Sequence, residues 1–209
     1  MPRAFVPLAL GLSLLAGCVS SSVEKKDDYV QVKKRAPKPR EQRLKVAVLR
    51  FDDRSHYGKQ QLGSAGADVL QDFLVNSEQF RVFDRADIDA VIAERELTGI
   101  QATKAVGTEL QCDYVFVGVI TNFGYTTQGN DVLVYEDTTQ LCEAEVTVKL
   151  IDPKTGEVVM QRSGRGYADT STTEVMGLGG EMSFDERNAG RALRAAIAKY
   201  IDELIDATS

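Results

Sequence analysis

Residues 44–51 (LKVAVLRF) constrain the fold of this chain most, because apolar side chains occupy both sides of the strand alternation. That pattern is typical of a β-strand buried on both faces. Residues 114–120 (YVFVGVI) give the strongest strand signal, since they are rich in β-branched and aromatic side chains. We therefore expect a β-sheet with helices packed against it.

Helical spacing of apolar residues alternates with further strand patterns. It predicts helices over residues 62–75, 84–99, 103–110 and 185–205. Strands are expected at residues 80–83, at residues 144–151 and from Val158 onward, the last two joined by a turn at residues 152–157. The order βαβα(α)βββα predicts an α+β fold with a mixed β-sheet, helices packed on it and a long C-terminal helix.

Residues 1–17 have the composition of a secretory signal peptide, with Arg3 before an apolar stretch and a small Ala-Gly pair at the end. The stretch is too short for a permanent transmembrane helix. The tetrapeptide LAGC, which ends at Cys18, matches a lipobox. We predict that Cys18 carries lipid and attaches the chain to a membrane. Val19 favours the outer membrane, because an aspartate there would favour retention at the inner one. The alternative is an ordinary secretory signal whose cleavage region contains a cysteine.

Residues 18–45 are a predicted disordered basic tether, because they are polar, contain two prolines and have almost no large apolar side chain. Nine Lys and Arg against four acidic residues give the tether a net charge of +5, which leaves −12 for residues 46–209. This acidic part is long enough for one domain with its own core, and its charge argues against nucleic acid as a partner.

The chain lacks the residue sets that common catalytic sites require. His56 is its single histidine and lies in a predicted loop, so we expect a surface histidine and no metal site. Asp52 and Asp53 could form a carboxylate pair, but neighbours in sequence usually point apart, and a strand-end turn is preferred. The glycines within residues 177–180 do not follow a buried strand, which favours a loop over a nucleotide site. We predict no cofactor and no enzymatic activity.

Cys112 and Cys142 invite a disulfide in an oxidising compartment. If residues 114–123 pair with residues 141–151 around a turn near Gly129, Cys142 lies opposite about residue 117, on the order of 16 Å from Cys112. That separation favours two buried free thiols.

Six motifs follow one another along residues 46–197. They are VAVLRFDDRS (46–55), FRVFDR (80–85), AERELTG (93–99), CDYVFVGVITNFG (112–124), VKLIDPKTGEVV (148–159) and ALRAAI (192–197). Together they resemble the CsgG family of outer-membrane lipoproteins, which includes curli and holdfast proteins. The motifs are mostly core and turn residues, so they identify a scaffold more than an activity.

The resemblance to the family's secretion channel implies a ring of periplasmic domains whose β-hairpins form one barrel. Such hairpins need two strands of about 9–11 residues with alternating apolar side chains. The candidate segments here, residues 121–142 and 165–184, are more polar. β-Hairpin extensions are therefore one alternative, and a sheet extension with a loop is the preferred one. We carry over no pore residue.

The resemblance also implies a function. It is that of a non-enzymatic outer-membrane lipoprotein that supports assembly or export of a curli- or holdfast-like surface structure. It implies a homo-oligomer, with a secretion channel as one form, and protein partners from a surface-assembly system. The rival hypothesis is a monomeric periplasmic lipoprotein that regulates a peptidoglycan synthase, as LpoB does; TGEVV (155–159) suits this class too. A tether that spans at most on the order of 90 Å disfavours a regulator that reaches through the wall.

Overall fold

The fold is built on one mixed β-sheet. The computed structural model describes residues 32–55, 57, 61–94, 97–132, 135–175 and 186–208. The strand order is β3-β1-β4-β5-β6, with β2 beside β4. Strands β3, β1 and β4 run parallel, whereas β4, β5 and β6 are antiparallel. The bounds are β1 Leu44–Val48, β2 Asp52–Asp53, β3 Phe80–Val82, β4 Tyr114–Val132, β5 Tyr135–Ile151 and β6 Val158–Val175.

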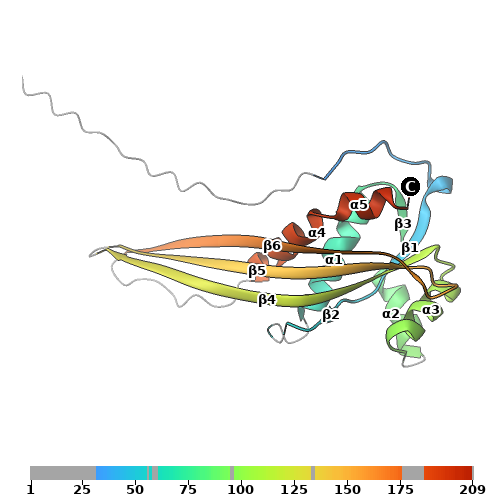
Figure 1. Cartoon of the computed structure of the whole chain (residues 1–209), viewed down its shortest axis with the longest axis horizontal. Helices are drawn as coiled ribbons and strands as arrows, with labels where there is room; N and C mark the ends of the chain where they lie inside the picture. The colour runs from blue at the N-terminus through green and yellow to red at the C-terminus, as the bar shows by residue number, and fades with distance from the viewer. Residues whose placement is uncertain are drawn as a thin grey trace, which may run out of the picture.

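Helices cover both faces of the parallel part of this sheet (Figure 1). Helices α1 (Gln61–Asn76), α4 (Glu186–Ala198) and α5 (Ile201–Asp206) contribute to one apolar cluster, and α2 (Arg85–Glu94) and α3 (Gly99–Glu109) to another. Strand β1 serves both clusters, because Val46 and Val48 face the first while Ala47 faces the second. The predicted α+β fold with a mixed sheet is therefore confirmed, as is the two-faced burial of this strand.

The strands β4, β5 and β6 are far longer than the usual five or six residues, at 19, 17 and 18 residues. Strand β4 pairs with β5 from Val115↔Ile151 to Val132↔Tyr135, with a register shift between Ile120 and Asn122, and β5 pairs with β6 as far as Tyr135↔Val175. They form a ribbon that projects well past the helices (Figure 1). We call this part, residues 121–132, 135–145 and 165–175, the ribbon. Residues 121–132 and 135–142 are thus a sheet extension, as preferred from the sequence. Residues 165–175 belong to β6, where a loop was preferred, and residues 176–184 lie outside the described part.

The predicted register of the β4–β5 hairpin was wrong, although the conclusion drawn from it holds. Cys142 lies opposite Tyr125, not near residue 117, because both strands continue past Gly129 and still pair at Val132↔Tyr135. Apolar alternation fades in this polar stretch, so it could not locate the turn. Cys112 and Cys142 are both buried and are not joined in a disulfide, as predicted.

The C-terminal helical segment has the predicted buried face but is divided in two. Helix α4 ends at Ala198, and α5 begins at Ile201 after Tyr200, whose φ of −130° and ψ of 0° are not helical. Tyr200 and Ile201 are consequently both buried although they are neighbours. Helix α3 also begins earlier than predicted. Its first residue is Gly99, four residues before the predicted start, and the φ of +58° at Gly99 is a backbone conformation that glycine adopts readily.

Candidate functional site

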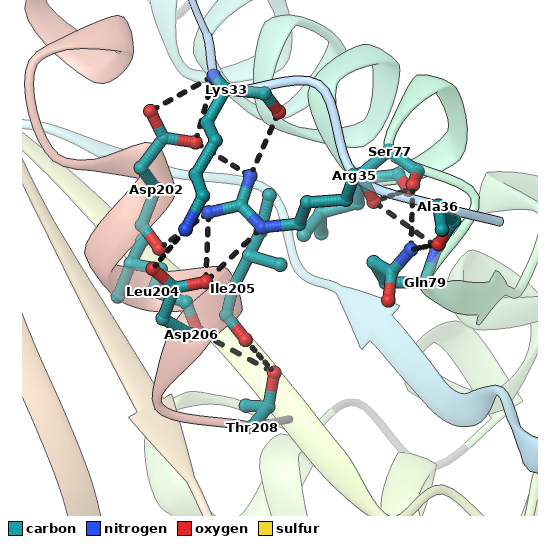
Figure 2. A network of polar contacts seen from close by, with 11 residues as sticks. Lys33, Arg35, Ala36, Ser77, Gln79, Asp202, Leu204, Ile205, Asp206 and Thr208 are labelled. Carbon is teal, nitrogen blue, oxygen red and sulfur yellow. Dashed lines mark hydrogen bonds and ion pairs between the residues drawn. The ribbon is translucent and has the colours of Figure 1, made fainter. Parts of the chain in front are cut away.

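The segment before β1 lies against the C-terminal helix rather than apart from the domain (Figure 2). We call residues 32–43 the strap. Arg35 is its main contact: Nη1 lies 2.6 Å from Oδ1 of Asp202, and Nη2 lies 2.9 Å from Oδ1 of Asp206. The Arg35 side chain is only 10% exposed. Both partners of these hydrogen bonds are charged, which makes the bonds stronger than those between neutral groups.

The electrostatics of this contact follow from its geometry. Partial burial alone would lower the pKa of Arg35, but hydrogen bonds to Asp202 and Asp206 outweigh it and raise the pKa. Reciprocally, the hydrogen bond from Arg35 lowers the pKa of Asp206. Both groups are therefore charged across the neutral range.

Further contacts hold the strap on each side of Arg35. The backbone N–H of Lys33 donates to the Asp202 carboxylate at 3.1 and 3.2 Å. On the other side, Nε2 of Gln79 donates to the Ala36 carbonyl at 2.8 Å. Gln79 is buried, so its amide needs this partner. The strap is thus fixed to α5 and to the turn between α1 and β3.

A groove of about 770 Å³ opens beside the strap, within the usual range for a ligand site. Its walls come from the strap at 32–35, the end of α1, residues 167–168 of β6 and the outward side of α4. Five cationic side chains line it, namely Lys33, Lys34, Arg35, Arg191 and Arg194, against the single acidic residue Glu78 among the described lining residues. We call it the basic groove.

Of the residues singled out from the sequence, Cys18, His56 and residues 177–180 lie outside the described residues. Asp52 and Asp53 form the short strand β2, paired with Val119 and Ile120, where a turn was expected. The backbone pairing with β4 accounts for this difference.

The two carboxylates of β2 have separate partners. Asp52 pairs with Arg54 at 2.7 Å, and Asp53 Oδ1 accepts hydrogen bonds from the backbone N–H and hydroxyl of Ser55 at 3.0 and 2.6 Å. They do not act as one carboxylate pair. Burial raises the pKa of the Cys112 thiol to about 12, which keeps it protonated and unreactive.

Within the described part of the chain, no group of three or more His, Cys, Asp or Glu side chains is arranged to hold a metal ion. None of the helices described there has the length and apolar character to cross a membrane.

The strap and the basic groove were not predicted from the sequence. A signal for them exists, because Asp202 and Asp206 are four residues apart and so share one side of a helix, while Lys33, Lys34 and Arg35 form a basic run. Pairing these two patterns across the whole length of the chain requires the fold.

Among the solved structures, two bacterial proteins show weak similarity to this chain. The lipoprotein GNA1162 from Neisseria meningitidis is 12% identical, covers 78% of this chain and 99% of its own, and has a TM-score of 0.46. The LpoB C-terminal domain from Salmonella enterica is also 12% identical, covers 58% of this chain and 81% of its own, and has a TM-score of 0.43. Likenesses at these scores carry no argument about function.

Sequence similarity gives a firmer result. The "Putative lipoprotein NMB1126/NMB1164" of Neisseria meningitidis serogroup B is 28% identical over 175 residues, which are 79% of this chain and 76% of that protein. The family described as "Curli production assembly/transport component CsgG" matches residues 19–209. The resemblance read from the sequence motifs is thereby confirmed, and the chain belongs to the CsgG family.

Proposed function

We propose that this protein is an oligomeric lipoprotein of the cell envelope that supports assembly or export of a surface structure without being an enzyme. Lipid on Cys18 holds it to the outer membrane, and the domain faces the periplasm. Membership of the CsgG family and similarity to a lipoprotein support this proposal. The same family would also accommodate a regulator of a peptidoglycan synthase, which is the rival function.

The two unpaired edges of the ribbon support the proposal that the protein forms an oligomer. Within the described residues, neither the edge of β4 beyond Ile120 nor the outer edge of β6 pairs with another strand. Unpaired strand edges of this length are templates for pairing with another chain. Because one edge is offered by β4 and the other by β6, copies can pair β4 to β6 in a head-to-tail order. Such a heterologous contact closes into a ring when its rotation allows.

The polar chemistry of the described residues is consistent with a non-enzymatic role. Asp52 and Asp53 have separate partners, and the buried Cys112 thiol is protonated at neutral pH. The strap argues against the rival function. A regulator that spans the cell wall would need the whole segment before β1 to be extended, but contacts with α5 and Gln79 hold part of that segment on the domain.

Molecular mass in detergent tests the oligomer. The protein is extracted from membranes, measured by size-exclusion chromatography with light scattering and viewed by negative-stain electron microscopy. Rings or a defined multiple of the protomer mass are expected. A single monomeric species would contradict the oligomer and favour the rival.

A pair of matched variants tests whether the strand edge makes the contact. Thr170 and Thr172 lie on edge strand β6, directly opposite Gln140 and Thr138 on the middle strand β5. Lys at both β6 positions should reduce the oligomer, because charged edges resist pairing. Lys at both β5 positions adds the same charge at the same height of the ribbon and should leave the oligomer intact. Equal loss in both variants would argue against edge pairing.

Deletion of the gene separates the two functions in cells. Loss of a surface structure with unchanged peptidoglycan synthesis is expected. Reduced activity of a peptidoglycan synthase with intact surface structures would support the rival function.

A further inference from the structure

The basic groove differs in charge from the rest of the domain. Residues 46–209 carry a net charge of −12, yet five cationic side chains, three from the strap and two from α4, line the groove with only Glu78 opposing them among its described lining residues. Positive side chains gathered in a concave surface concentrate the field and attract anions. The acidic surfaces of the domain would repel the same anions, so the groove is a favourable place for them.

The cations of the groove are not all equally engaged. Lys33 and Arg35 pair with Asp206 and Asp202, as Figure 2 shows, and these carboxylates offset their charge. Lys34 is exposed and forms no ion pair with a described residue. Arg194 reaches Asp72 only at 3.7 Å, with both side chains largely exposed. A contact of this kind contributes little, so the charges of Lys34 and Arg194 stay available to a ligand.

The same groove has an apolar floor. Phe73, Ala168 and Ala198 are buried residues that line it, and the Arg194 guanidinium lies 4.6 Å from the centre of the Phe73 ring. A guanidinium stacked on an aromatic face keeps its N–H groups at its edge, where they can donate to an anion. The site therefore combines cationic donors with an apolar surface next to them.

We propose that the basic groove binds the phosphate headgroup of an anionic lipid. Lys34 and Arg194 donate to the phosphate, with Arg191 beside them, and Phe73 and the alanines contact the glycerol and first methylenes. The strap forms one wall of the groove and leads back toward Cys18 in the sequence. A lipid-anchored chain would thus present this groove close to a membrane surface. The proposal goes beyond the proposed function and does not require it.

Vesicle co-sedimentation tests this assignment. The protein is the chain from residue 18 with Cys18→Ser, which keeps every residue that the structure describes and has no acyl chains. It is mixed with vesicles of phosphatidylcholine alone or of phosphatidylcholine and phosphatidylglycerol at about two to one. Binding is expected only to the vesicles that contain phosphatidylglycerol. Equal binding to both, or to neither, would overturn the proposal.

Two charge-reversal variants make the test specific to the groove. Lys34→Glu with Arg194→Glu should weaken binding by about tenfold or more, since each basic residue near an anionic surface contributes substantially. Lys104→Glu with Lys154→Glu makes the same charge change at exposed positions of α3 and the β5–β6 turn. This control should bind within about twofold of the unmodified chain. Equal losses in both variants would reduce the effect to net charge and overturn the site.

Folding and ligand source are controlled separately. The single variant Lys34→Glu changes only an exposed side chain, so it should fold normally and still weaken vesicle binding; unchanged binding by this folded variant contradicts the proposal. Soluble glycerol phosphate carries the same charged group without acyl chains. It should leave the vesicle-bound fraction unchanged, whereas release of the protein would reassign the groove to a soluble phosphate ester.

Discussion

Two glycines allow α4 to lie directly on β6. A Cβ atom at Gly166 would come within 2.2 Å of the Ala192 carbonyl oxygen and of the Ala196 backbone nitrogen. Gly164 meets α4 in the same way, since its Cβ would lie 2.3 Å from the Ala196 carbonyl oxygen. Because these neighbours are backbone atoms, they cannot turn aside as a flexible side chain would. The absence of a side chain at these positions therefore sets the distance between the helix and the sheet.

Gly166→Ala should lower the free energy of unfolding by about 1–3 kcal/mol, because the added methyl group forces α4 away from β6. Urea denaturation followed by circular dichroism measures this change. Gly124→Ala is the matched control in β4, where a Cβ atom meets nothing within 4 Å. Its effect should stay within about 0.5 kcal/mol. Similar stability of the two variants would contradict the close contact of α4 and β6.

Tyr200 has a buried hydroxyl group that is expected to reduce stability. Its side chain is buried, burial raises the pKa of its hydroxyl, and the hydroxyl oxygen has no hydrogen-bond partner among the residues that the structure describes. Tyr200→Phe should therefore raise the free energy of unfolding by up to about 1 kcal/mol, since the desolvation cost of an unpaired hydroxyl is removed. Thermal denaturation measures it, with the exposed Tyr125→Phe as control. A clear loss of stability would mean that the hydroxyl has a bound partner.

At the scale of elements, the attachment of the strap to α5 depends mainly on the guanidinium of Arg35. Arg35→Ala removes both carboxylate contacts and should free residues 32–38, so their amide hydrogens should exchange about tenfold faster or more. Hydrogen exchange with mass spectrometry measures the peptide. Arg40→Ala is the control, because Arg40 is an exposed strap residue that forms no ion pair with a described residue. Unchanged exchange in Arg35→Ala would assign the strap's attachment to Gln79 instead.

The strap should also respond to acid in a defined direction. The pKa of Asp206 is lower in the folded protein than its usual value of 3.8, so the contact contributes above that value and is lost as pH falls through the folded pKa. The chemical shift of the Arg35 Nε–H in NMR spectra should therefore stay constant from pH 7 to about 5 and move only below about 4, as Asp206 becomes protonated. A change of this shift already between pH 7 and 6 would contradict control by Asp206.

Elements with strong local patterns were predictable from the sequence, whereas the site was not. Strand β1 and helix α1 are encoded by apolar residues a few positions apart, so their periodicity reveals them. The β4–β5 register failed where side chains become polar, because alternation then no longer distinguishes strand from turn. Residues 32–43 have the composition of a linker. Their attachment depends on carboxylates more than 160 positions away, which local patterns do not detect.

At the scale of the whole molecule, the proposed location depends on two adjacent residues. Cys18→Ser should move the protein from the membrane fraction to the soluble fraction of disrupted cells, because no acyl chain can then be attached. Val19→Asp keeps the lipid but should shift the protein from the outer to the inner membrane on a density gradient. Retention of Cys18→Ser in the membrane fraction would contradict lipid as the main attachment.

The strap has a consequence for how the domain meets its partners. With lipid on Cys18, fourteen positions precede Val32, so a docked strap confines the domain to within on the order of 50 Å of its anchor. If the strap were released, the extended chain from Cys18 to Leu44 would allow a distance of about 90 Å between the anchor and the domain. The volume available to the domain shrinks to roughly a sixth when the strap is docked, which raises its effective concentration for neighbours in the same membrane. Arg35 would then control how often two lipid-anchored copies collide.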